Sequence, residues 1–245
     1  MKPSKLLSLF TGVFTALLVL SASIAVPLLC RPFYYAHIEA LNLDGYTGLS
    51  VEQIREAFDQ VMDYCLGLRP DFAAGVLPFS ESGASHFADV RVLFLLDLWV
   101  AVISLAALVI LFIISRRKKL TPTSLMGHGP GFWAAIGLGG LFLIVGGLAA
   151  TNFERAFVIF HSLFFPGKTN WLFDWRTDPI ILLLPEDFFR NCAILILTLL
   201  IFWCVILIVA DLLAQHRRKK LAPPPASPCS GCPGGGDCSG CSGCS

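Results

Sequence analysis

Four apolar stretches constrain the fold of this chain more than any other feature of its sequence. The first runs from Leu6 to Cys30, and the second follows Asp97 and runs to Ser115. The third lies between Phe132 and Ala150, and the fourth between Arg190 and Asp211. The hydrocarbon core of a bilayer is about 30 Å thick and needs about 20 apolar residues in a helix. Each stretch must be helical because backbone groups in lipid have no water to bond. The sequence therefore predicts an all-α, polytopic membrane protein with four transmembrane helices.

The overall composition agrees with this class of protein. Hydrophobic residues make up 56% of the chain and charged residues only 14%, whereas a soluble domain carries about 25% charged residues. This excludes a soluble enzyme, a disordered chain and a small disulfide-stapled scaffold. The net charge of +1 gives no indication of a nucleic-acid partner.

The basic residues predict the topology. Lys2 and Lys5 precede the first stretch, a basic run at 116–119 follows the second, and another at 217–220 follows the fourth. The positive-inside rule places all three clusters in the cytoplasm. We therefore expect a multi-pass protein of the cell membrane with both termini inside. The four-helix transmembrane domain covers residues 1–212. Two loops, loop one (31–91) and loop two (151–190), then face outward.

The first stretch admits a second interpretation as a cleaved signal peptide. The apolar part of a signal peptide spans about 7–15 residues, and this uninterrupted run is longer. We therefore expect a retained helix, and cleavage would leave the orientation of the other three unchanged.

Loop one contains a clear soluble helix. Ser50 and Gln53 have the spacing of a capping box, and Gly67 is a candidate C-cap. Apolar side chains follow at helical spacing: Val51, Ile54, Phe58, Val61, Met62 and Cys65. The pattern predicts a small helical cap on the extracytoplasmic ends of the transmembrane helices.

Loop two is unusually aromatic, with eight Phe and two Trp between residues 152 and 189. Trp171 and Trp175 are suited to the headgroup region of a bilayer, and the Phe residues to shallow burial or to a groove for acyl chains. His161 lies within this loop, close to the end of the third stretch. We expect loop two to lie against lipid rather than in free water.

Two histidines are then expected on the same side of the membrane at similar depth. His86 precedes the second stretch, and Asp89 shares its helix face, where a carboxylate could orient the imidazole. A lone interfacial histidine commonly has no catalytic role, but the coincidence of His86 with His161 favours an acid–base pair. His37, beside Tyr34 and Tyr35, is a candidate third member.

The segments SHFADVRVLF and FHSLFFPGKTNWLFDWRTDPIILLLPEDFF, on four expected spans, resemble the bacterial lipoprotein intramolecular transacylase family, Lit. The resemblance covers about residues 1–212. It implies an acyltransferase that acts on lipoproteins whose N-terminal cysteine carries diacylglycerol. The sn-2 acyl chain moves to the α-amino group of that cysteine and leaves a lyso-form lipoprotein. The resemblance also implies that the two functional histidines are His86 and His161, that no cofactor takes part, and that the partners are diacylglyceryl-modified lipoproteins and membrane lipids.

The chemistry of the two histidines fits this reaction. An α-amino group titrates near pH 7.7–8.0, so an imidazole can take its proton at neutral pH, and a second imidazole can protonate the departing alkoxide. The sequence has no Gly-x-Ser-x-Gly elbow, in keeping with a reaction that needs no acyl-enzyme. The sequence leaves open which histidine is the base. It also leaves open which side chain stabilises the oxyanion; the candidates are Tyr34, Tyr35, Arg155, Asn170 and Arg176.

Two other classes of function remain open at this point. One is a non-catalytic, four-span scaffold or binding protein. The other is a metal-dependent membrane hydrolase with ligands drawn from His37, His86, Asp89 and His161, although these residues form no compact motif such as His-Glu-x-x-His.

The last segment, residues 213–245, is expected to be a cytoplasmic tail that is basic, then Pro-rich, then rich in Cys and Gly. Its cysteines have the spacing of metal ligands: Cys229, Cys232, Cys238, Cys241 and Cys244. A low-complexity tail without a metal is the favoured interpretation.

Overall fold

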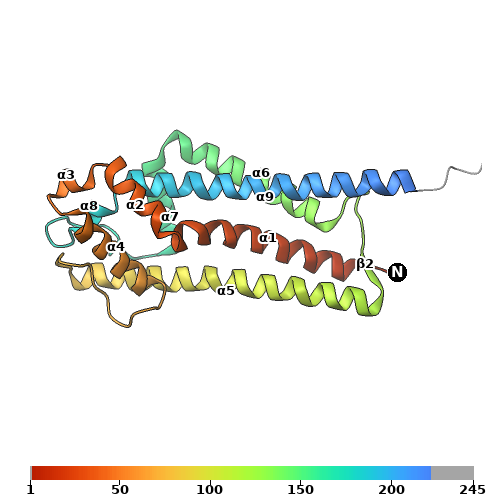
Figure 1. The fold of residues 1–245 in the computed structure, drawn as a ribbon, viewed down its shortest axis with the longest axis horizontal. Helices are drawn as coiled ribbons and strands as arrows, with labels where there is room; N and C mark the ends of the chain where they lie inside the picture. Colours follow the sequence, from red (N-terminus) through yellow and green to blue (C-terminus); the bar gives the residue numbers. More distant parts are fainter. Residues whose placement is uncertain (1, 222–245) are drawn as a thin grey trace, which may run out of the picture.

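The computed structural model describes residues 2–221. Four long helices run side by side along the long axis of the molecule (Figure 1). They are α1 (Lys5–Leu29), α5 (Glu81–Lys118), α6 (Pro130–Thr151) and α9 (Glu186–Leu221). All four are long and apolar enough to cross a membrane. The four-helix prediction is confirmed.

The bundle is held together by close contacts among these four helices. α1 packs against α5, α6 and α9, and α6 packs along α9. Where α6 meets α9, a Cβ on Gly139 would lie 3.5 Å from the Sγ of Cys204. Small residues allow such a close approach of helices in lipid, where packing rather than the hydrophobic effect drives association.

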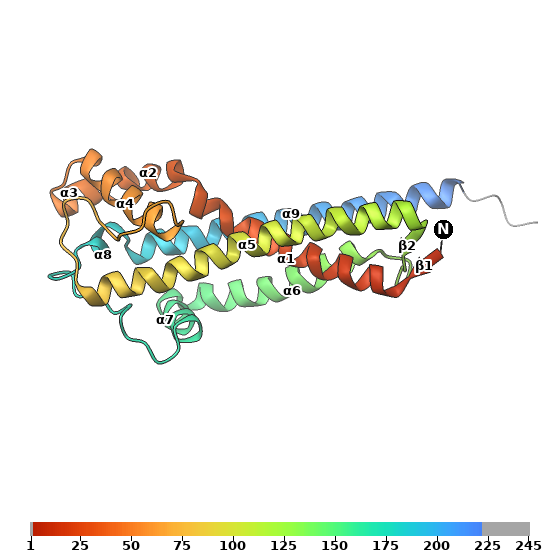
Figure 2. The same ribbon diagram turned by 90° about the horizontal axis from the view of Figure 1, so that it is seen from below.

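One end of the bundle carries a short parallel strand pair. β1 (Lys2–Ser4) pairs with β2 (Leu120–Pro122), with Lys2 opposite Leu120. Both ends of the described chain lie at this end (Figures 1 and 2). Because it holds the basic runs at residues 116–119 and 217–220 as well, we call it the basic end.

The opposite end carries a cluster of short helices, which we call the cap. It consists of α2 (Arg31–Ala40), α3 (Leu43–Thr47), α4 (Val51–Cys65) and α8 (Ile180–Leu183). The capping box of Ser50 and Gln53 starts α4 as the sequence predicts. The rings of Tyr34 and Phe58 stack 3.6 Å apart in the centre of the cap. Buried aliphatic side chains surround them: Ile38, Ile54, Val61 and Leu183.

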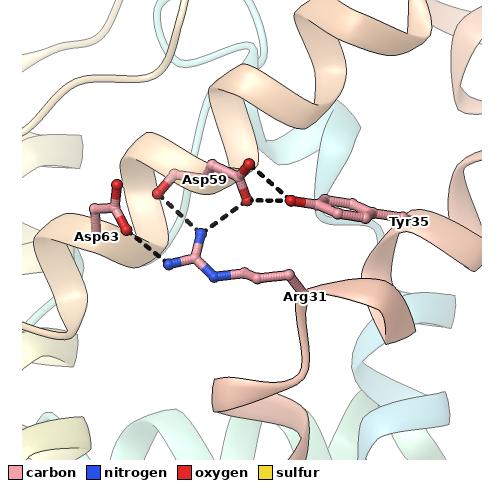
Figure 3. Close-up of polar contacts among 4 residues, drawn as sticks. All are labelled: Arg31, Tyr35, Asp59 and Asp63. Carbon is pink, nitrogen blue, oxygen red and sulfur yellow. Dashed lines mark hydrogen bonds and ion pairs between the residues drawn. The ribbon is translucent and has the colours of Figure 1, made fainter.

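A polar network fastens α2 to α4 (Figure 3). The guanidinium of Arg31 donates to the carboxylates of Asp59 and Asp63 at 2.8 Å each, and also to the Asp59 backbone carbonyl. The Tyr35 hydroxyl donates to the same Asp59 carboxylate. Since Arg31 is the first residue of α2, the network fixes the cap directly where the chain leaves α1.

The length of α5 places its first turns beyond the bilayer. The helix has 38 residues, or about 57 Å at 1.5 Å per residue, against a hydrocarbon core of about 30 Å. The apolar part of α5 begins near Asp97. Residues 81–91, which the sequence assigns to loop one, form the first turns of α5 ahead of that apolar part. Loop two contributes α7 (Phe153–Phe164), which lies on the opposite side of α5 from α4 in Figure 2.

Candidate active site

The structure brings His86 and His161 together. His86 lies in the second turn of α5 and is 5% exposed, and His161 lies near the end of α7 and is 8% exposed. Their ring centroids are 5.9 Å apart. The two candidate imidazoles therefore lie next to each other, on the same end of the bundle as the cap.

A buried carboxylate from loop two positions the start of α5. Asp178 accepts hydrogen bonds from the backbone N–H and the hydroxyl of Ser80, each at 2.8 Å. Ser80 is the N-cap of α5, and its hydroxyl in turn accepts from the Gly83 N–H. A Cβ on Gly83 would overlap the Asp178 carboxylate, so this close approach requires glycine.

Aromatic rings enclose both imidazoles. His86 has Phe165 at 5.0 Å and Phe173 at 5.4 Å, both in T-shaped geometry. His161 has the Phe157 ring at 4.2 Å, and Trp171 stacks on it at 4.7 Å. Loop two and α7 supply all four rings, so the aromatic richness of the sequence here serves to exclude water from the two histidines.

The hydrogen bonds of His161 fix its tautomer. Its Nδ1 lies 2.8 Å from the Phe157 carbonyl oxygen, which can only accept, so Nδ1 carries the proton and Nε2 has a free lone pair. Burial lowers the pKa of His161 below its ordinary value of 6.5, and the bond to the Phe157 carbonyl only partly offsets this. The ring is therefore a neutral base at pH 7.

His86 has an unsatisfied nitrogen. Its Nδ1 is buried and has no hydrogen-bond partner among residues 2–221. Leaving a buried polar group unpaired costs about 1–3 kcal/mol. Such an atom beside a second imidazole is suited to accept or donate a hydrogen bond when a substrate arrives.

A cluster of polar side chains lies over the turn of α5 that bears His86. The Lys168 ammonium pairs with Asp89 at 2.5 Å, and the Asn170 Nδ2 donates to Asp89 at 3.1 Å and to Ser85 at 3.4 Å. Asp89 therefore holds loop two rather than bonding to His86. Because the carboxylate requires a donor, the amide of Asn170 is oriented with its Oδ1 away from Asp89. That Oδ1 is buried and unpaired in the described part of the chain.

Among residues 2–221, none of the other candidates from sequence is hydrogen-bonded to either histidine of the pair. Tyr34 donates to the Leu183 carbonyl inside the cap, and Tyr35 donates to Asp59. His37 donates from Nδ1 to the Phe33 carbonyl. Arg155 is exposed on α7, and the Arg176 guanidinium lies over the Trp175 ring. Of the candidate oxyanion donors, only Asn170 contacts the turn of α5 that bears His86.

The donor set for a metal-dependent hydrolase does not assemble. Within residues 2–221, no three side chains of His, Cys, Asp or Glu are grouped so as to hold a metal ion. His37 packs on Phe33 and Phe188 in the cap instead of joining the pair. The five tail cysteines lie outside the described residues.

Several residues of this site could not be found from sequence. In the sequence, Asp178 next to Pro179 indicates a turn that interrupts regular secondary structure. Lys168 looks like an exposed cation of a loop. Neither periodicity nor spacing connects them to α5, because their partners are distant in sequence. The aromatic density of loop two was the one available signal for Phe165, Phe173 and Trp171.

Comparison with known proteins places this chain in a class of integral-membrane acyltransferases. The family model of the lipoprotein intramolecular transacylase Lit matches residues 9–189. The chain belongs to the Lit family.

Solved structures agree with this assignment. The Lit transacylase of Bacillus cereus, crystallised in meso, is 25% identical with a TM-score of 0.76, over 89% of this chain and 97% of that one. Two variants of the same protein, with one histidine changed to arginine or alanine, superpose with TM-scores of 0.71 and 0.72 at 23% identity. They cover 88% and 89% of this chain, and 93% and 95% of theirs. A search of curated protein sequences gave no match.

Proposed function

We propose that this protein transfers the sn-2 acyl chain of a diacylglyceryl-modified lipoprotein to the α-amino group of its N-terminal cysteine, on the extracytoplasmic face of the cell membrane. The observation that carries the proposal is the buried pair of His86 and His161, with ring centroids 5.9 Å apart in an aromatic enclosure. Membership of the Lit family supplies the class of substrate.

In this proposal His161 acts as the base. Its Nδ1–H is committed to the Phe157 carbonyl, so Nε2 accepts the proton that the substrate amine loses as it attacks the ester carbonyl. The new amide C–N bond forms and the ester C–O bond breaks. The proton then passes from His161 to one ring nitrogen of His86, whose other ring nitrogen gives up a proton to the departing glyceryl oxygen, so that both imidazoles end neutral. The net result is one proton moved from nitrogen to oxygen.

Asn170 is suited to hold the attacking amine. Its Oδ1 is a buried acceptor without a partner among residues 2–221, and an amine N–H is the donor that such an oxygen needs. The bond from Nδ2 to Asp89 keeps the amide in this orientation. Holding amine and ester in one geometry is the main requirement here, because both groups belong to the same substrate molecule.

The serines next to the histidines are not suited to act as nucleophiles. The Ser162 hydroxyl donates to the Val158 carbonyl of its own helix at 2.9 Å, the Ser85 hydroxyl accepts from Asn170 at 3.4 Å, and within residues 2–221 neither hydroxyl is hydrogen-bonded to an imidazole that could take its proton. Direct aminolysis without an acyl-enzyme therefore fits the site better than a serine mechanism.

The outer surface of α7 supports an interfacial location. Val158, Ile159, Phe160, Leu163 and Phe164 are exposed on this helix although they are apolar. An amphipathic helix of this kind lies in the headgroup region with its apolar face toward acyl chains. This position brings the ester of a membrane-anchored lipoprotein to the level of His161.

The orientation follows from charge. The ten Lys and Arg residues at 2, 5, 116–119 and 217–220 all lie at the basic end, which the positive-inside rule places in the cytoplasm. The cap and the histidine pair, at the opposite end of the bundle, then face outward, where mature lipoproteins are anchored.

The test is expression in a bacterium that lacks any other lipoprotein N-acylation, followed by mass spectrometry of lipoprotein N-terminal peptides. We expect the N-acylated lyso-form with the wild type. His86→Ala and His161→Ala should lower its yield by about 10²–10⁴-fold, the usual contribution of an acid–base group. His216→Ala, an exposed histidine at the basic end, is the control and should keep full activity.

Two outcomes would contradict the proposal. If only diacylglyceryl cysteine is found while the wild-type protein is present in the membrane, the chain acts as a scaffold rather than an enzyme. If both histidine variants keep full activity, acid–base catalysis by the pair is wrong.

A further inference from the structure

A groove lies at the basic end, far along the bundle from the histidine pair. It has a volume of about 540 Å³ and runs between α1 and α6, closed on one side by the loop at residues 123–128. Gly12 and Pro130 form its floor, where a Cβ on Gly12 would lie 3.6 Å from the Pro130 Cβ. Leu9 and Val13 line its wall and are exposed. An apolar groove open along two transmembrane helices is suited to an acyl chain.

The rim of the groove is polar. Lys5, Ser8, Thr123 and Ser124 line it where α1 begins. The Ser8 hydroxyl donates to the Thr123 carbonyl at 2.8 Å, which holds the loop against α1. The Thr123 Oγ1 itself is buried and has no partner among the described residues. A hydroxyl donor thus lies at the head of the groove without an intramolecular acceptor.

The charge around this rim is strongly unbalanced. Residues 2–20, 108–140 and 205–221 make up this end and contain ten Lys and Arg residues but one carboxylate, Asp211. Asp211 is already engaged, since it accepts from His128, from the Gly129 N–H and from Gln215. The strand pair adds to the imbalance, because the Lys2 N–H donates to the Lys119 carbonyl and brings two basic segments together.

We propose that this groove binds an anionic phospholipid of the adjacent leaflet. The phosphate meets the Lys5 ammonium, the Thr123 side chain rotates to bring its buried and unpaired hydroxyl to the phosphate, and one acyl chain lies along Leu9 and Val13. Trp133 flanks the site with its Nε1–H bonded to the Leu125 carbonyl, as expected of tryptophan at a membrane interface. A soluble phosphate ester would satisfy the rim but leave the apolar wall empty, so the ligand is a lipid.

The experiment is native mass spectrometry of the full-length protein released from detergent micelles. Phosphatidylglycerol and phosphatidylcholine with identical acyl chains are added in separate samples. We expect the wild type to retain one phosphatidylglycerol, at least several-fold more than phosphatidylcholine. Lys5→Ala and Thr123→Val should each lower this retention several-fold. Lys118→Ala is the matched control, since Lys118 is an exposed cation of the same end outside the groove, and it should behave as the wild type.

A steric variant separates the groove from general surface charge. Val13→Phe fills the wall without changing the charge and should also lower retention, while thermal unfolding of each variant checks that the bundle is intact. Three results would overturn the proposal: equal retention of both lipids by the wild type, equal losses in Lys5→Ala and Lys118→Ala, or full retention in Val13→Phe. None of these readouts depends on acyl transfer, so the proposed enzymatic function stands or fails separately.

Discussion

Asp178 in loop two accepts both the backbone N–H and the hydroxyl of Ser80, so a single carboxylate joins this loop to the N-cap of α5. His86 follows within two turns of that cap, and loop two also carries rings that enclose both histidines. The geometry of the pair therefore depends on a contact that involves neither imidazole directly.

Gly83→Ala should disrupt this contact. The added Cβ overlaps the Asp178 carboxylate, and overpacking of a buried site costs about 1–3 kcal/mol. The strain shifts the start of α5 relative to loop two, and about 1 Å of misplacement at a reacting centre can cost about 10²-fold in rate, so we expect the yield of lyso-form lipoprotein to fall about ten-fold or more. Gly140→Ala is the control, because a Cβ there meets nothing within 4 Å. Equal activity of the two variants would show that Asp178 does not position the site.

The pH dependence of acyl transfer should respond to Trp171→Ala. Burial holds the pKa of His161 below 6.5, so in the wild type the ring stays neutral, and active as a base, to pH values below 6.5. Removal of the stacked indole admits water and moves the pKa of His161 upward. The acidic limb of the rate profile should then shift to higher pH. The substrate amine, which titrates near pH 7.7–8.0, contributes the same first break to both profiles, so the shift is measured at the second, more acidic break. Coincident second breaks would contradict the assignment of His161 as the base.

Tyr34→Phe should destabilise the cap. The Tyr34 hydroxyl donates to the Leu183 carbonyl at 2.8 Å, and the side chain is 1% exposed. Its loss leaves a buried carbonyl unpaired, at a cost of about 1–3 kcal/mol, which should appear as a lower thermal unfolding temperature in detergent. Tyr46→Phe alters a tyrosine that is 72% exposed and should leave that temperature unchanged. A matching decrease in both variants would show that the bond contributes nothing.

The network in Figure 3 predicts a ranking of two carboxylates. The two side chains are similarly exposed, at 38% for Asp59 and 43% for Asp63, but Asp59 accepts from both Arg31 and Tyr35, whereas Asp63 accepts from Arg31 alone. Exposed ion pairs contribute about 0–1 kcal/mol, so Asp63→Asn should have little effect. Asp59→Asn should release α4 from α2, detected as faster hydrogen exchange of the α4 amides. Faster exchange of the α4 amides in Asp63→Asn than in Asp59→Asn would contradict this prediction.

Chelators should not inhibit acyl transfer. Across residues 2–221 the side chains form no group of three metal donors, and the proposed chemistry needs only two imidazoles. We expect equal yields of lyso-form lipoprotein in membranes treated with EDTA and in untreated membranes. Loss of activity that zinc restores, in a variant with the five tail cysteines replaced by serine, would favour the metal-dependent alternative.

The sequence by itself determined the four transmembrane helices and the start of α4. In lipid each segment must satisfy its own backbone hydrogen bonds, so an apolar run of about 20 residues specifies a helix regardless of its neighbours. The capping box at Ser50 is local in the same sense, because both of its partners lie within one helical turn. The basic runs that indicate orientation are also readable without knowledge of the fold.

Only the tertiary structure decided how the two histidines meet. The contacts of Asp178 with Ser80 and of Lys168 with Asp89 join α5 to loop two across a long stretch of sequence. The same holds for Tyr34, Tyr35 and His37, whose place in the chain suggested the active site but whose polar groups bond within the cap. Side-chain partners of this kind depend on which surfaces the helices present to one another, and no periodic pattern in the sequence encodes them.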